Sequence, residues 1–232
     1  EQSGVGTDAS FMQAILVGLV NLVFTVVAMA LIDRIGRRPL LGIGLSGIAV
    51  CMFLLAYGFG SAGYTLGASD VDEFPPELDR AALQQVVDIE YQSDVEFRQA
   101  VTSADGEAAF QQHESVLVSV AVDLNASLIL FAILGFVASF AISLGPVMWV
   151  LFSELFPNTL RGLAISFAGL INSGVSFGVQ LVFPWELQKL GSSMTFLIYG
   201  VFALVGLVLM LRILPETRGR SLEELEEILV RR

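Results

Sequence analysis

Residues 143–164, SLGPVMWVLFSELFPNTLRGLA, determine the fold. They overlap an uncharged run, because no charged residue occurs in the 30 positions of 124–153. A helix needs roughly 20 apolar residues to cross a bilayer, so this run predicts a membrane span. Pro146 removes one backbone hydrogen bond from that helix, which predicts a kink between Ser143 and Trp149. Charged residues and Pro157 follow, and they predict a turn at the membrane surface.

The composition is that of a membrane protein. Hydrophobic residues make up 55% of the 232 residues, and the mean hydropathy is +0.75. They are concentrated in uncharged runs, each long enough to cross a bilayer. The predicted fold class is therefore an all-α membrane protein with five transmembrane helices. We expect these spans at about 11–32, 40–59, 124–155, 162–183 and 193–214.

Basic residues predict the orientation and the domain organisation. The short loop 33–39 carries three arginines, which places it in the cytosol by the positive-inside rule. The N-terminus of the chain is then outside and the C-terminus cytosolic. Four regions follow: the first two spans with their basic loop (1–59), an acidic extracellular insert with short helices (60–123), the last three spans (124–214) and a cytosolic amphipathic tail helix (215–232).

The insert is strongly acidic. It holds 13 of the 23 acidic residues in a chain of net charge −11 whose single lysine is Lys189. This composition suggests a high-salt environment, in which screening weakens self-repulsion, although a plain solvated acidic loop gives the same pattern. Ser93 and Glu96 have the spacing of a capping box. We expect two or three short surface helices, the last running from about Gly106 continuously into the third span.

Three motifs in a fixed order resemble a known family. Gly145-Pro146-x-x-Trp149, with the loop that follows it up to Arg161-Gly162, resembles the tenth span and next loop of sugar porters in the major facilitator superfamily. The stretches 33–38 and 215–221 agree with the same family. The resemblance covers about 8–58 and 124–225 and implies spans eight to twelve of a twelve-span fold. The partner it lacks would be the N-terminal half of the transporter, without which we expect no transport.

Polar residues in the predicted spans are candidates for substrate binding. Ser173, Ser176 and Gln180 follow i, i+3, i+7 spacing, with Asn172 beside them, so they share a helix face. Amides can donate to and accept from sugar hydroxyls, and an aromatic face can pack on a pyranose. Pattern alone favours the alternative, in which such residues only join helices by hydrogen bonds. The resemblance implies four substrate-binding residues: Asn21, Trp149, Asn172 and, more weakly, Gln180.

The remaining spans and two departures from the family complete this interpretation. The second and fifth spans are almost wholly apolar, so we expect them to be peripheral and lipid-facing. Met148 stands where the family often has a second proline, which would reduce gating flexibility at the kink formed by Gly145 and Pro146. Ala141 replaces a glutamate found in some members, so a coupling role is excluded at that position.

Charged residues at the cytosolic face form a second candidate group. If the spans bundle with matched ends, arginines and carboxylates lie close enough to form salt bridges that close the inner side and break when it opens. The alternative is that topology and lipid headgroups alone place the arginines, which leaves the carboxylates unexplained. The predicted gating residues are Arg34, Arg37, Arg38, Glu154, Arg161 and Glu216.

The predicted function is secondary transport of a monosaccharide or related polyol across the plasma membrane, by uniport or coupled to a proton or sodium ion. The predicted partners are the sugar and the lipid bilayer; we expect no enzymatic activity, catalytic residue, cofactor, metal site or nucleic-acid partner. His113 is expected to be a solvated surface residue and Cys51 a small core residue. A non-transporting membrane remnant or sensor, or a transporter of a non-sugar metabolite, are the alternatives. A retinal protein is excluded because Lys189 lies outside the predicted spans.

Overall fold

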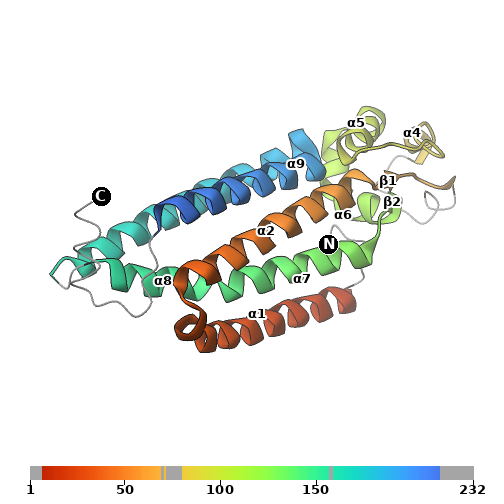
Figure 1. The fold of residues 1–232 in the computed structure, drawn as a ribbon. Helices are drawn as coiled ribbons and strands as arrows, with labels where there is room; N and C mark the ends of the chain where they lie inside the picture. The colour runs from red at the N-terminus through yellow and green to blue at the C-terminus, as the bar shows by residue number, and fades with distance from the viewer. Residues whose placement is uncertain (1–6, 69–70, 72–79, 157–158, 215–232) are drawn as a thin grey trace. The chain divides into compact units, whose positions relative to one another are not determined.

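The structure is a computed structural model that describes residues 7–68, 71, 80–156 and 159–214. The predicted tail helix and Glu216 lie outside these residues. Helices dominate, with one short pair of strands (Figure 1). In chain order the elements are α1 (Thr7–Ile35), α2 (Arg37–Gly60), β1 (Gly63–Tyr64), α4 (Arg80–Leu83), α5 (Asp94–Asp105), α6 (Glu107–Ala121), β2 (Val122–Asp123), α7 (Ala126–Ile142), α8 (Leu144–Leu155) and α9 (Arg161–Ile213).

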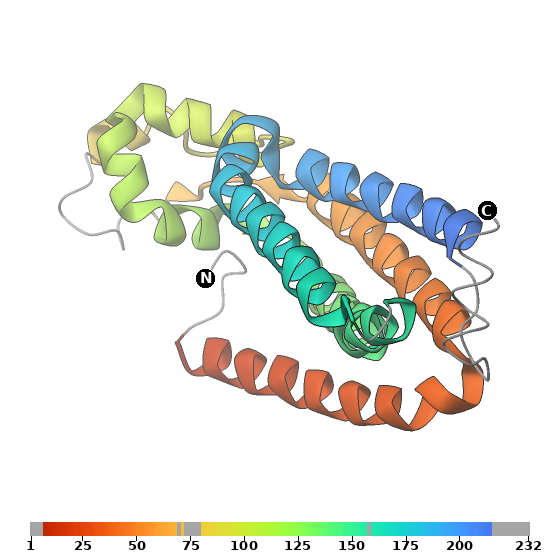
Figure 2. The ribbon, with the colours of Figure 1, turned by 90° about the vertical axis from the view of Figure 1, so that its left-hand side faces the viewer.

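Four helices in the described part of the chain are long and apolar enough to cross a membrane. They are α1, α2, the α7–α8 pair and α9. The last is 53 residues long, about 80 Å if it were straight, which exceeds a bilayer core of about 30 Å. Gly191 interrupts α9 with non-helical dihedrals (φ 81°, ψ 165°). The ribbon of α9, coloured from teal to blue, folds back on itself (Figure 2).

The break between α7 and α8 falls at Ser143, whose dihedrals (φ −125°, ψ −92°) are not helical. Pro146 is the third residue of α8, where its missing N–H would have had no partner within that helix. The proline therefore sits in a first turn, where it does no damage to the hydrogen bonds of α8.

Contacts divide the chain into two compact units. Unit 1 comprises the described parts of Glu1–Leu16, Phe53–Phe131 and Glu186–Leu197. Unit 2 comprises Val17–Met52 together with the described parts of Ala132–Trp185 and of the chain from Ile198 onward. Each has its own buried apolar cluster.

Unit 1 is built around the acidic segment (60–123). Its fully buried side chains include Phe97, Val101 and Phe110, which come from the helices α5 and α6. Ser93 caps α5: its Oγ accepts a hydrogen bond from the backbone N–H of Glu96 at 3.2 Å. Glu96 Oε2 accepts in return from the N–H of Gln92 at 3.3 Å, so the local signal that predicted this helix start operates in the structure.

The predicted continuous helix from Gly106 into the third span is wrong. α6 ends at Ala121, and the next two residues form β2, which pairs antiparallel with β1. The carbonyl of Ala121 accepts a hydrogen bond from the N–H of Thr65 at 2.8 Å. This pairing satisfies backbone groups outside a helix, and it separates α6 from α7.

Unit 2 contains a close contact between α2 and α7. A Cβ added at Gly44 would overlap the side chain of Ser143, and one at Gly47 would overlap that of Ser139. One at Gly135 would come within 2.9 Å of the sulfur of Cys51. Half of the apolar window of α2 is buried, so one face of this span packs within the chain, while Ile43 and Val50 are exposed. Small residues let two backbones approach in this way.

Candidate functional site

A single glycine links α1 to α2. Gly36 has φ 103°, a backbone conformation that favours glycine over residues with a Cβ. Its N–H donates to the carbonyl of Ile32 at 3.2 Å, and the N–H of Leu40 donates to the Gly36 carbonyl at 3.4 Å. The glycine in the motif of residues 33–38 therefore permits a one-residue connection, which sets Arg37 at the first position of α2.

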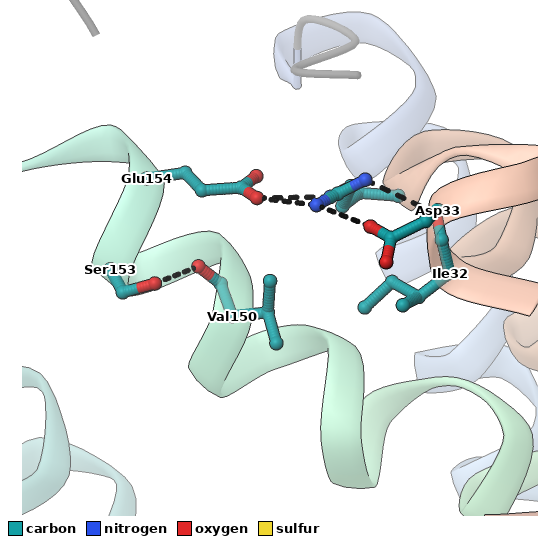
Figure 3. Close-up of polar contacts among 6 residues, drawn as sticks. Ile32, Asp33, Val150, Ser153 and Glu154 are labelled. Carbon is teal, nitrogen blue, oxygen red and sulfur yellow. Dashed lines mark hydrogen bonds and ion pairs between the residues drawn. The ribbon is translucent and has the colours of Figure 1, made fainter. Parts of the chain in front are cut away.

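Arg37 pairs with Glu154, the residue before the last of α8 (Figure 3). Its Nη2 lies 2.6 Å and its Nε 3.1 Å from Glu154 Oε1. Nη2 also lies 3.1 Å from Asp33 Oδ1, and Nη1 donates to the carbonyl of Ile32 at 3.2 Å. One guanidinium thus joins the end of α1, the start of α2 and the end of α8.

The surroundings of this ion pair are partly apolar. The side chains of Arg37 and Glu154 are 13% and 23% exposed, whereas that of Asp33 is 77% exposed. The neighbouring cluster of unit 2 buries Ile32 and Leu151 beside them. An ion pair shielded in this way is screened less by salt than a surface pair, so Glu154 contributes more attraction than Asp33 does.

Two other predicted gating arginines, Arg38 and Arg161, bond backbone carbonyls. Arg38 Nη2 donates to the backbone carbonyl of Leu211 at 2.5 Å, and Arg161 Nε donates to that of Phe156 at 3.3 Å. Arg34 is exposed and has no ion-pair partner among the described residues. Backbone carbonyls at helix ends are common acceptors for arginine, so through these bonds Arg38 and Arg161 each contact the end of a helix.

Trp149 lies beside α9. Its side chain is 47% exposed and meets Phe152 edge to face, with ring centroids 6.1 Å apart. A Cβ added at Gly169 would lie 3.9 Å from Trp149 Cη2, so the indole rests near the backbone of α9 at that glycine. Asn172 is three residues further on, on the same side of the helix. The structure thus brings the indole of Trp149 to within one turn of Asn172.

The three amide candidates for substrate binding have exposed side chains that are not hydrogen-bonded to one another in the described part of the chain. The side chains of Asn21, Asn172 and Gln180 all face outward from the described residues. In that part of the chain no hydrogen bond joins any of them to Trp149 or to one another. Ser143, at the break between α7 and α8, is fully buried, and its Oγ donates to the Ser139 carbonyl at 2.6 Å. It therefore contributes to helix packing.

Sequence reasoning left Asp33 out of the gating group. It stands four residues before Arg37, the spacing at which opposite charges meet on a helix. That signal was available in the motif. Asp33 and Arg37 still pair across the break at Gly36, because the connection between the two helices is one residue long.

A family model described as "Sugar (and other) transporter" matches residues 1–68 and 107–229, which is most of the chain. The chain belongs to the sugar porter family of the major facilitator superfamily. The stretch that the family model leaves out, 69–106, falls within the acidic segment. The match includes 60–68 and 107–123, so it extends further into the acidic segment than the sequence-based expectation, which left out all of 60–123.

Individual sugar porters show the same relationship. The chain is 31% identical over 231 residues to the D-xylose-proton symporter of Escherichia coli (strain K12), covering 97% of this chain and 35% of that protein. It is 27% identical over 228 residues to the arabinose-proton symporter of Bacillus subtilis (strain 168), covering 98% and 36%. The solved structure of the proton:xylose symporter XylE bound to 6-bromo-6-deoxy-D-glucose matches with a TM-score of 0.61 and 29% identity, covering 97% and 36%. The chain spans about a third of the length of these relatives.

Proposed function

We propose that this sugar porter chain forms the C-terminal spans of a secondary transporter that carries a monosaccharide or related polyol across the plasma membrane by alternating access. The family and the relatives named as xylose and arabinose symporters support a sugar as the substrate. Because the chain spans a third of the length of those proteins, we propose that the remaining spans of the transporter are supplied by its N-terminal part. This chain alone is then not competent for transport, since alternating access requires one half to move against the other.

The proposed arrangement has five crossings. α1, α2 and the α7–α8 pair each cross once, and α9 crosses twice with its turn at Gly191. Support comes from the length of α9, which is more than twice what one crossing needs, and from the non-helical dihedrals at that glycine. With the arginine-bearing turn at Gly36 in the cytosol, Gly191 and the acidic segment (60–123) are on the outer side.

The position of Trp149 beside Gly169 is the main observation that supports the proposed substrate site. An aromatic ring beside an exposed amide offers the two kinds of contact that a sugar requires: a flat apolar face, and a group that both donates and accepts hydrogen bonds. A Cβ added at Gly169 would be in ordinary van der Waals contact with the indole, so the ring lies close to the surface of α9. We place Asn172 and Trp149 in the same sugar site, and we propose that Asn21 and Gln180 also bind the sugar.

In the proposed cycle the Arg37–Glu154 ion pair closes the cytosolic side. It joins residues 117 positions apart in sequence, and it is sheltered enough to hold helix ends together. Opening inward would separate α8 from the α1–α2 turn and expose both charges to water. We place a flexible point at the α7–α8 break, next to Gly145 and Pro146, because the backbone at Ser143 is already non-helical.

Coupling to a proton is the proposed energy source, since two of the similar proteins are named proton symporters. The second candidate is transport of a non-sugar metabolite. The breadth of the family description, which includes other transporters, and a similarity of 28% to the probable metabolite transport protein CsbC of Bacillus subtilis favour it. Competition by unlabelled sugars in an uptake assay separates the two.

The test is uptake of a radiolabelled monosaccharide by the full-length transporter that contains this chain, expressed in a host without sugar uptake of its own. Trp149→Ala and Asn172→Ala are each expected to lower uptake about tenfold or more at unchanged membrane abundance, because the sugar loses an aromatic platform in the first variant and a hydrogen-bonding amide in the second.

Matched controls are available in the chain. Trp185→Ala removes the other tryptophan, which is 56% exposed. Leu170→Ala removes a side chain that is 69% exposed and lies on the opposite side of α9 from Asn172. Uptake that falls equally in a control and in its paired variant would reject the assignment of the site.

A further inference from the structure

Asp94 contacts two helices at once. It is the first residue of α5, and its Oδ1 accepts a hydrogen bond from the N–H of Val95 at 2.9 Å. Its Oδ2 accepts two more at 2.8 Å, from the backbone N–H and the Oγ of Ser192 in α9. These residues are 98 positions apart in sequence and belong to the same compact unit.

The turn of α9 lacks a cap of its own. The helix resumes at Ser192, and the residue before it, Gly191, has no side chain with which to accept from the free N–H groups of the new first turn. A Cβ added at Gly191 would lie 2.5 Å from Asp94 Oδ1 and 3.0 Å from Val95 Cγ2. The glycine thus admits the carboxylate of Asp94, which caps the second arm of α9 from another helix.

Charge reinforces this arrangement. The N-terminus of a helix carries a partial positive charge, and here two N-termini, those of α5 and of the second arm of α9, face one carboxylate. Ser192 is only 8% exposed, so water competes weakly for the bonds. Thr195 is fully buried, and its Oγ1 donates to the Gly191 carbonyl at 2.8 Å, which holds the turn on its other side.

The helix that carries Asp94 is itself anchored. Arg98, one turn further along α5, forms an ion pair with Glu114 of α6, and its guanidinium lies 4.9 Å from the ring centroid of Phe110. Phe97 is fully buried in the same core. Because α5 is fixed to α6 in this way, a bond from Asp94 to Ser192 ties the α5–α6 core of the acidic segment to the α9 turn.

We infer that Asp94 is a positioning residue that latches the acidic segment (60–123) onto the turn of α9 at Gly191. The segment is then a fixed part of the fold and not a loosely attached solubilising loop. The arm of α9 that ends at this turn carries Asn172 and Gln180, so the latch holds one end of the helix that bears candidate substrate residues.

Lys189 makes this inference directly testable. It is the single lysine of the chain, it is exposed, and it precedes the turn by two residues. A lysine-specific protease therefore cuts the 232-residue chain once, and only when the helix around Lys189 opens locally. In the regime where reclosing is fast, the cleavage rate reports the population of that open form.

Asp94→Ala is expected to raise the cleavage rate of the detergent-solubilised chain about tenfold or more, because two hydrogen bonds to a charged acceptor are lost. Ser192→Ala removes one of them and should raise the rate by a few fold. The double variant should be cut no faster than Asp94→Ala, since the second change then removes nothing. Asp94→Asn keeps an acceptor oxygen without the charge, and should fall between the wild type and Asp94→Ala.

Two controls separate the latch from a simple weakening of the segment. Ser93→Ala removes the N-cap of α5 without touching α9, and Glu90→Gln removes an exposed charge of the same segment. Both should be cut at the wild-type rate. The inference is overturned if Ser93→Ala accelerates cleavage as much as Asp94→Ala, or if the effects of Asp94→Ala and Ser192→Ala multiply. If Asp94→Ala does not fold, as shown by the loss of its circular-dichroism melting transition, the test rests on Ser192→Ala and Asp94→Asn. Cleavage of both at the wild-type rate would then overturn the inference.

Discussion

Breaking the Arg37–Glu154 pair is expected to destabilise the chain measurably. Two unit charges about 4 Å apart attract by about 4 kcal/mol at an effective dielectric constant of about 20, and desolvation offsets much of this. Exposed pairs contribute about 0–1 kcal/mol, whereas removing one partner of a fully buried pair costs about 3–5 kcal/mol. With side chains 13% and 23% exposed, this pair lies between those limits, and we expect a coupling energy of about 1.5 kcal/mol.

The assay is a double-mutant cycle of Arg37→Gln and Glu154→Gln, with unfolding of the chain followed in mixed detergent micelles. Arg37→Gln should cost more than Glu154→Gln, because Arg37 also bonds the Ile32 carbonyl and pairs with Asp33. Arg34→Gln serves as the control, since that arginine is exposed and has no ion-pair partner among the described residues. A coupling energy below about 0.3 kcal/mol, the scatter expected for independent sites, would refute the reasoning.

Two further predictions concern packing and pH. Gly44→Val should lower the midpoint of thermal unfolding and cost about 1–3 kcal/mol through overpacking, because a Cβ there overlaps Ser143. Gly206→Ala is the control, and it should leave the midpoint unchanged because nothing lies within 4 Å of a Cβ at that position. Equal midpoints for the two variants would show that α2 does not pack on α7 as described. Burial and the nearby charge of Asp94 raise the pKa of the Tyr64 hydroxyl, so the native state keeps this proton when the unfolded state releases it near pH 10. The free energy of unfolding should therefore fall above about pH 10, and Tyr64→Phe should remove part of that fall in unfolding curves measured from pH 8 to pH 11. If the free energy of unfolding depends on pH equally in the variant and the wild type, the burial of this hydroxyl is contradicted.

Local signals in the sequence predicted local features of the structure. The cap at Ser93 uses residues three positions apart, and uncharged runs of adequate length mark the helices that can cross a membrane. The basic loop 33–39 contains the turn at Gly36 that separates α1 from α2. In each case the determining residues are neighbours in the sequence or form one continuous run, so the pattern itself holds the information.

Features that depend on distant residues were not predictable in this way. An apolar helix face that meets another helix looks the same in sequence as one that meets lipid, so the sequence could not show which half of α2 is buried. The cause of this burial is the match of Gly44 with Ser143, which only the packing shows. The bond from Asp94 to Ser192 has the same character. The substrate-binding roles of Asn21 and Gln180 remain predictions, because both side chains are exposed and neither is hydrogen-bonded to Trp149 among the described residues.

Uptake of radiolabelled D-xylose tests the central claim most directly. The full-length transporter that contains this chain is compared with the host alone, with membrane abundance measured in parallel. We predict saturable uptake that unlabelled monosaccharides compete away. Uptake equal to that of the host at normal abundance, with D-xylose, L-arabinose and D-glucose each tried as the labelled sugar, would contradict the assignment of this chain to a sugar-transporting protein.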